Sequence, residues 1–267
     1  MRALAPLTLV LSLTSQAQAH EFWISPQTYQ VAPGGEIIAE LRVGEKLKGA
    51  GFPYIPTRTA RFEILQGDTR LDPQARIGDR PALQRVVDTP GLAIVVHETA
   101  DTFLQYPSWE KFEAFTSQKD FAWAQDMHRD RGLPEHGFSE VYRRYGKALV
   151  AVGDGAGADR PIGLDTEIVA LANPYTDDLS GGLPVRVLHF GAPRSDVQVT
   201  LFARGADGTV STSLHRTDGA GVAVLPMMAG TEYLVDSVIL EPLEPAAEGD
   251  PVWYTLWASL TFRTPNE

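Results

Sequence analysis

His20 is the residue whose place in the sequence could carry chemistry, because a cleavage signal stands directly before it. The segment Ala17-Gln18-Ala19 has the small-x-small pattern of a signal-peptidase site. Cleavage after Ala19 gives the mature chain a terminal histidine, with a free α-amine and an imidazole on one residue. When both groups are deprotonated they can chelate one metal ion. An α-amine has an ordinary pKa of about 7.7–8.0, so we expect metal affinity to fall in mild acid.

Residues 1–19 have the composition of a secretory signal peptide. Arg2 supplies the positive n-region, and a mostly apolar, leucine-rich stretch follows it. Cleavage after Ala17 is an alternative and would leave Gln18 at the terminus. We expect cleavage before His20 and export to a bacterial periplasm. Beyond the signal peptide no apolar run approaches the roughly 18 residues of a membrane helix, so we expect no direct membrane insertion.

A terminal chelate needs at least one further nitrogen ligand to complete a T-shaped or square-planar set. No histidine pair has i, i+4 spacing, and there is no H-E-x-x-H motif. His97 ends an apolar strand-like run, where a ligand and a rim residue are equally plausible, and His136 follows the expected helix end at Gly132. Phe22 occupies the third mature position, so the amino-terminal copper/nickel motif is absent. We therefore predict a metal site from His20, His97 and His136, with nickel, cobalt or copper as the metal.

Composition and motifs exclude several other classes of function. The 267-residue chain has no cysteine, which excludes disulfides, thiolate metal sites and cysteine nucleophiles. A formal net charge of −11 disfavours nucleic acid and anionic membranes as partners. No G-x-S-x-G, Walker or dinucleotide motif occurs, and no carboxylate spacing marks an acid/base pair. These absences favour a non-enzymatic protein without a nucleic-acid partner.

Most of the mature sequence consists of short β-type runs separated by turn residues. The runs 36–43, 59–65 and 92–97 contain β-branched or aromatic residues and are bounded by Gly, Pro or Asp. About seven such runs fall in the last hundred residues or so, with turns every 8–12 residues, which is typical of an immunoglobulin-like sandwich. The pattern predicts a mainly β protein of two immunoglobulin-like antiparallel β-sandwich domains.

One region departs from this β pattern. Aromatic residues recur at near-helical spacing from Trp109 to Trp123, and Ser108 can act as the N-cap. A second short helix is expected over 139–145. We therefore predict a helical insertion at about 107–146, whose aromatic stripe docks the helix on a sheet rather than lining a groove.

The clearest candidate linker is residues 153–159, which are rich in Gly, Ala and Asp. We place the domain boundary there. The expected domains are an N-terminal sandwich at 20–157, which contains the helical insertion, and a C-terminal sandwich at 158–267.

Several segments of the chain resemble a family of exported bacterial proteins. The family consists of domain-of-unknown-function proteins labelled periplasmic components of cobalt or nickel uptake systems. The opening and closing segments are the more specific ones. The similar segments are HEFWISP at 20–26, ELRVGE at 40–45, WEKFEAF at 109–115, YRRYGKAL at 142–149 and WYTLWASLTF at 253–262.

The resemblance implies β-sandwich domains, export and a link to transition-metal handling. Ser237 or Val238 stands where relatives carry a histidine, so that strand provides no histidine ligand in this chain. We expect a periplasmic, non-enzymatic protein that binds or delivers a divalent transition metal, with an inner- or outer-membrane metal transporter as partner. Two alternatives are a copper-dependent oxidative enzyme with a terminal-histidine chelate and a metal-free interaction module.

Overall fold

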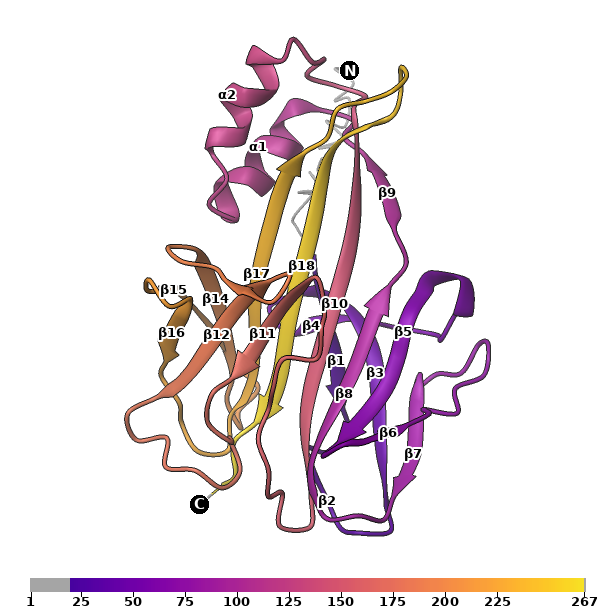
Figure 1. Cartoon of the computed structure of the whole chain (residues 1–267), viewed down its shortest axis with the longest axis vertical. Coiled ribbons are helices and arrows are strands. Elements are labelled where there is room, and N and C mark those ends of the chain that lie inside the picture. Colours follow the sequence, from indigo (N-terminus) through magenta and orange to yellow (C-terminus); the bar gives the residue numbers. More distant parts are fainter. Residues whose placement is uncertain (1–19, 267) are drawn as a thin grey trace, which may run out of the picture.

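The structure is a computed structural model that describes residues 20–266. The predicted signal peptide, residues 1–19, lies outside the described residues. The protein is mainly β, with 50% strand and 9% helix, which confirms the expected fold class at this level. Figure 1 shows long strands running along the molecule and two helices gathered at one end.

A ten-stranded sheet forms the centre of the fold (Figure 1). Its strands, in spatial order, are β15 (Val210–Arg216), β14 (Gln198–Arg204), β17 (Glu232–Pro242), β18 (Pro251–Arg263), β10 (Ser139–Val152), β8 (Gly91–Thr99), β5 (Thr59–Gln66) and β6 (Thr69–Leu71), while β2 (Gln30–Val31) and β9 (Thr102–Gln105) also pair with β10. Strands from both sides of the expected boundary at 153–159 therefore belong to one sheet.

The expected purely antiparallel arrangement is wrong at the middle of this sheet, where β10 runs parallel to β18. The register places Glu140 beside Trp253 and Ala148 beside Thr261. Parallel neighbours cannot be joined by a tight hairpin and need a long crossover. Here the crossover contains most of the second half of the chain, which the local β pattern could not reveal.

Two smaller sheets cover the central one. The first contains β1 (Glu21–Pro26), β3 (Gly35–Glu45), β4 (Lys48–Phe52) and β7 (Leu83–Val87). The second contains β11 (Thr166–Ala170), β12 (Leu183–His189), β13 (Ala192–Pro193) and β16 (Val222–Leu225). A short 3₁₀ helix, η1 (Pro56–Arg58), precedes β5.

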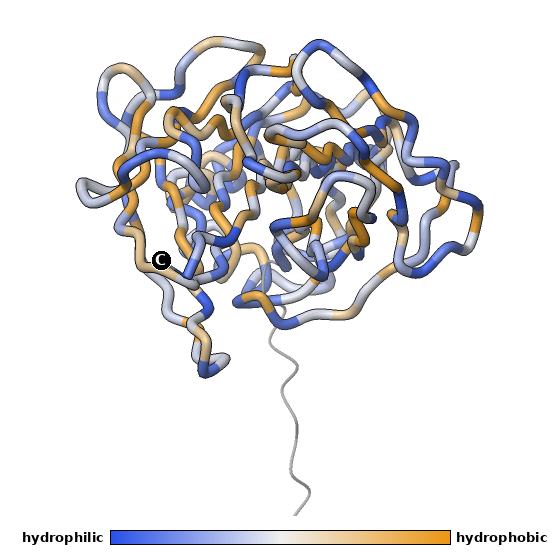
Figure 2. Tube along the Cα trace, turned by 90° about the horizontal axis from the view of Figure 1, so that it is seen from below, coloured by the Kyte–Doolittle hydropathy of each residue, from blue (hydrophilic) through white to orange (hydrophobic). Residues whose placement is uncertain are grey.

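Both faces of the central sheet are apolar because alternate residues of its inner strands enter different cores. On β8, Ile94 belongs to the core that includes Ile168 and Val185 of the second small sheet. Its neighbour Val95 belongs to the core that includes Ile24 of the first small sheet. Strand side chains alternate between faces, so a strand buried on both sides reads as a continuous apolar run. Figure 2 shows hydrophobic positions recurring along the stacked strands in the middle of the molecule.

Two helices, α1 (Trp109–Gln118) and α2 (Trp123–Asp130), lie between β9 and β10. Phe112 and Phe115 are buried and contact Trp253 and Trp257, at ring-centroid distances of 5.6 and 5.7 Å. The prediction that this aromatic stripe packs the helix on a sheet is confirmed for Phe112 and Phe115, whereas Trp123 is 45% exposed. The single expected helix is broken by Asp120, whose φ of +67° ends the right-handed helical backbone.

The second predicted helix, over 139–145, is wrong because these residues begin strand β10. This part of β10 pairs with β9 on one edge and with β18 on the other. The pairing buries Val141 and Tyr145, two residue types with high β propensity. Tertiary pairing therefore decides the conformation of a segment that local spacing left ambiguous.

A buried ion cluster ties the expected linker to β10. Lys147 is 1% exposed, and its Nζ lies 2.7 Å from Asp159 Oδ1 and 3.0 Å from Glu167 Oε1. Asp159 Oδ2 also accepts the backbone N–H of Ala170 at 2.9 Å. These carboxylates compensate a charge that would be costly to bury alone. The segment that follows β10 is thus fixed to the sheet.

In the described part of the chain no helix has the length and apolarity needed to span a bilayer.

Glu140, on β10, is a buried carboxyl whose ionisation opposes folding. Tyr106 Oη and Thr255 Oγ1 donate hydrogen bonds to its two oxygens at 2.9 and 3.0 Å, yet burial dominates and raises its pKa from 4.5 to about 7. For a raised carboxyl pKa, the stabilising contribution is fully present below pH 4.5 and is lost as pH rises through about 7.

We predict that Glu140→Gln stabilises the protein at pH 8 and has little effect at pH 5. The amide carries no charge to desolvate, so the gain at pH 8 should reach about 3 kcal/mol in the free energy of unfolding. Urea unfolding at both pH values measures it. Glu248→Gln, at an exposed glutamate, is the matched control and should show no such difference. An equal effect of Glu140→Gln at both pH values would contradict the assignment.

Candidate functional site

The first strand directs His20 and Phe22 toward the same pocket. Successive side chains of a strand point to opposite faces, so residues 20 and 22 share one face and Glu21 takes the other. The pocket has a volume of about 620 Å³, and His20, Phe22 and His97 all line it. Further walls come from η1, β4, β9 and β10. Two of the three histidines predicted as ligands, His20 and His97, thus line the same pocket.

His97 lies near the end of β8 and is 3% exposed. Its ring packs between the rings of Phe22 and Phe62, at centroid distances of 5.4 and 5.2 Å. Burial lowers the pKa of His97 from 6.5 to about 3. The imidazole is therefore neutral at any physiological pH, which is the state that a metal ligand requires.

The hydrogen bonds around His97 assign its tautomer. The Thr59 hydroxyl has one hydrogen, which it donates to the Ile55 carbonyl oxygen at 3.1 Å. At the 3.2 Å contact between Thr59 Oγ1 and His97 Nε2, the hydroxyl must then accept and the ring nitrogen donate. His97 Nδ1 keeps its lone pair, and among residues 20–266 it has no hydrogen-bond partner although it is buried. A ring nitrogen that donates to a fixed acceptor while the other keeps a free lone pair is the arrangement of metal-ligating histidines.

His20 itself lies at the surface, at the mouth of the pocket. Its side chain is 52% exposed, and Nε2 lies 3.7 Å from Glu45 Oε1. The His20 carbonyl oxygen accepts a hydrogen bond from Arg144 Nη2 at 3.4 Å. Arg144 also lines the pocket, so β10 holds the backbone of the first described residue near its rim.

Glu21 anchors the chain on the opposite face of β1. It is 1% exposed, and Lys119 Nζ donates to Glu21 Oε1 at 3.2 Å and to Asp236 Oδ2 at 2.7 Å. Burial raises the pKa of Glu21, and the Lys119 ammonium opposes that rise. The cluster joins β1, the end of α1 and β17. The residue next to His20 is therefore held inside the protein, which limits where His20 can lie.

His136 is exposed in the segment between α2 and β10 and is not among the residues that line this pocket. Within residues 20–266, no three or more His, Asp or Glu side chains are grouped so as to hold a metal ion. The structure therefore places His20 and His97 in the lining of one pocket and leaves His136 outside it.

His128 is a buried histidine whose two ring nitrogens both have hydrogen-bond partners. It is fully buried, its Nδ1 accepts from Trp253 Nε1 at 3.0 Å, and Nε2 contacts the Pro134 carbonyl oxygen at 3.0 Å. Both ring nitrogens are used, so His128 has no lone pair to offer. Of the two buried histidines within residues 20–266, His97 has a ring nitrogen without a hydrogen-bond partner and His128 does not.

Sequence reasoning missed Thr59 and Arg144. Thr59 begins β5 and sets the tautomer of His97, 38 residues away in the sequence. Arg144 lies 124 residues from the carbonyl that it contacts. Neither residue belongs to a local motif, because both act through long-range strand packing. The alternation of β10 indicates only that Arg144 and Tyr142 share a face.

The chain belongs to the family described as Domain of unknown function (DUF4198), whose model matches residues 17–240. None of the curated proteins matches the chain. This agrees with the expected domain-of-unknown-function family and leaves its metal-uptake label as a proposal.

Two solved structures show weak likeness. One is the tetra-tandem repeat in the extending region of a large adhesion protein, at 9% identity and a TM-score of 0.21, covering 91% of this chain and 49% of that one. The other contains the N-terminal four Ig domains of Dscam1 isoform 9.44, with zinc, at 8% identity and a TM-score of 0.19, covering 89% of this chain and 51% of that one. This chain spans about half the length of each, and likeness at these scores supports no argument about it.

We predict that His97→Leu costs little stability whereas His128→Leu costs much. Leucine fills a similar volume. At position 97 it removes a buried nitrogen that lacks a partner, together with the contact to Thr59, whose hydroxyl still donates to Ile55, so the change should stay below about 1.5 kcal/mol. At position 128 it leaves the Trp253 indole N–H buried without an acceptor, which should cost about 2–3 kcal/mol. Urea unfolding of both variants measures the difference. Comparable losses would show that His97 serves the fold rather than a ligand.

Proposed function

We propose that this chain is a periplasmic, non-enzymatic protein that binds or delivers a divalent transition metal. Nickel, cobalt and copper are the candidate metals, and an accessory role in metal uptake is the proposed context. The observation that carries the proposal is the free lone pair of His97 Nδ1, buried in the wall of the pocket that His20 also lines.

The proposed ligands are nitrogen atoms of two residues. If processing makes His20 the first residue, its α-amine and imidazole provide a chelate. His97 provides a third nitrogen and needs to lose no proton, because burial keeps it neutral. Three nitrogen ligands suit divalent nickel or copper. The absence of cysteine in the whole sequence agrees with a site that uses nitrogen rather than thiolate.

The aromatic lining of the pocket supports the same proposal. Phe22 and Phe62 hold the His97 ring on two sides, and Thr59 fixes its Nε2. A ligand whose orientation is fixed in advance loses little entropy when a metal binds. Arg144 holds the His20 carbonyl, so the backbone that carries the chelate is also positioned.

Export, partner and domain division complete the proposal. We propose that residues 1–19 direct export and that the metal is exchanged with an inner- or outer-membrane transporter. We also propose that residues 20–157 and 158–267 correspond to two immunoglobulin-like sandwiches, with the helical insertion in the first. The position of α1 and α2 between β9 and β10 supports the insertion, and the two small sheets on the central sheet support the two sandwiches.

The proposal predicts that metal affinity depends on a free amine at His20. Calorimetric titration of the processed protein with Ni²⁺ and Cu²⁺ should show one site. One alanine added before His20 removes the terminal chelate and should lower the affinity at least about a hundredfold. His97→Leu removes one nitrogen ligand and should lower it at least about tenfold.

His136→Ala is the matched control and should bind as the unaltered protein does. Equal affinity of the extended protein and the processed protein would overturn the terminal chelate. An unchanged affinity of His97→Leu would remove His97 from the site.

A further inference from the structure

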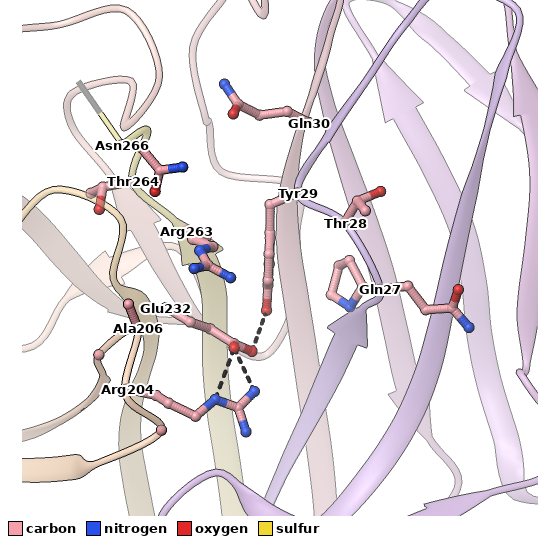
Figure 3. A pocket seen from close by; sticks show the side chains of 13 residues that line it. Gln27, Thr28, Tyr29, Gln30, Arg204, Ala206, Glu232, Arg263, Thr264 and Asn266 are labelled. Carbon is pink, nitrogen blue, oxygen red and sulfur yellow. Dashed lines mark hydrogen bonds and ion pairs between the residues drawn. The ribbon is translucent and has the colours of Figure 1, made fainter.

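A second pocket, of about 550 Å³, lies where β18 ends and shares no lining residue with the pocket of His20 and His97. Its walls come from the connection between β1 and β2, the end of β14, the start of β17 and the residues that follow β18 (Figure 3). These segments are far apart in the sequence, and the packing of the sheets brings their polar side chains into one hollow.

Glu232 forms the floor of this pocket and already has partners. It is 6% exposed, Tyr29 Oη donates to its Oε1 at 3.0 Å, and Arg204 Nε donates to its Oε2 at 3.0 Å (Figure 3). The Arg204 guanidinium therefore compensates the Glu232 charge. Arg204 Nη2 also donates to Oε2, so both lone pairs of that oxygen are used, whereas Oε1 keeps one lone pair and can still accept one hydrogen bond from a hydroxyl group.

Arg263 is the remaining charged side chain of the lining. Figure 3 draws it beside Tyr29 without an interaction to any other residue of the pocket. Within residues 20–266, its guanidinium takes part in no ion pair or hydrogen bond of the structure. With Arg204 and Glu232 balanced, the pocket carries one net positive charge, on a chain whose formal net charge is −11. The positive charge of the pocket can thus attract an anion, although the net negative charge of the protein repels anions overall.

Two neutral amide side chains line the same pocket as Arg263. They belong to Asn266 and Gln30, and all three residues are exposed to solvent. Their amides offer both donors and acceptors, which match hydroxyl groups rather than further charges. The lining therefore combines the Arg263 guanidinium, the buried Glu232 carboxylate and two neutral amides.

We propose that this pocket binds a small polyhydroxy carboxylic acid, which is a function beyond the proposed metal site. Arg263 takes the carboxylate through two parallel N–H···O bonds, because a guanidinium and a carboxylate are both planar and match in spacing. The hydroxyl groups of the ligand donate to Glu232 and pair with the amides of Asn266 and Gln30. The volume of about 550 Å³ has room for a six-carbon acid of this kind.

The test is calorimetric titration of metal-free, full-length mature protein in Tris-chloride with three probes. Gluconate has the carboxylate and the hydroxyls, glucose has the hydroxyls alone, and inorganic phosphate has the charge alone. We expect gluconate to bind, and glucose and phosphate to bind at least about tenfold more weakly. No binding of gluconate, or glucose binding equally well, would overturn the proposal. Equal binding of phosphate would overturn the assignment to a hydroxy acid and show a general anion site.

Variants of Arg263 locate the binding. Arg263→Gln should lower gluconate affinity at least about tenfold, and Arg263→Lys should retain part of it, because lysine keeps the charge but not the planar fork. Arg76→Gln, at an arginine that is 86% exposed and outside the pocket, is the matched control and should leave affinity unchanged. Unchanged affinity in Arg263→Gln would overturn the site. Because no metal is present, this result is independent of the His20 chelate.

Discussion

The parallel pairing of β10 with β18 is the constraint on which the rest of the fold depends. It places a strand of the first half beside the last strand of the chain and so makes one sheet of strands from both halves. Both faces of β10 are covered, and Lys147 inside it is compensated by Asp159 and Glu167. Both apolar cores contain residues of β10, with Leu149 in one and Val150 in the other.

The same strand sets the position of the candidate metal site. Gly146 of β10 lies against Phe22, and a Cβ there would come within 2.9 Å of the Phe22 ring. The close approach lets β1 pack on β10, which brings the Phe22 ring against His97 and leaves His20 at the rim. On the other face of β1, Glu21 is held by Lys119. The terminal strand is thus fixed from both sides, as a chelating terminus would require.

The sequence was sufficient to predict the mainly β class, and two of the three histidines predicted as ligands line one pocket. Alternating apolar runs predicted a mainly β protein, and aromatic spacing predicted the helix at Trp109 that packs on a sheet. It failed where long-range pairing decides the outcome: 139–145 forms a strand rather than a helix, and β10 runs parallel to β18. The orientation of His97 by Thr59 was equally out of reach, because no local pattern reports a hydrogen bond between strands.

The proposed metal site requires His20 and His97 to bind the same ion. Electron paramagnetic resonance of the processed protein with one equivalent of Cu²⁺ reports this, because nitrogen ligands split the copper signal. We expect nitrogen couplings from both histidines, with those of one imidazole lost in His97→Leu. Identical spectra from the unaltered protein and His97→Leu would contradict it.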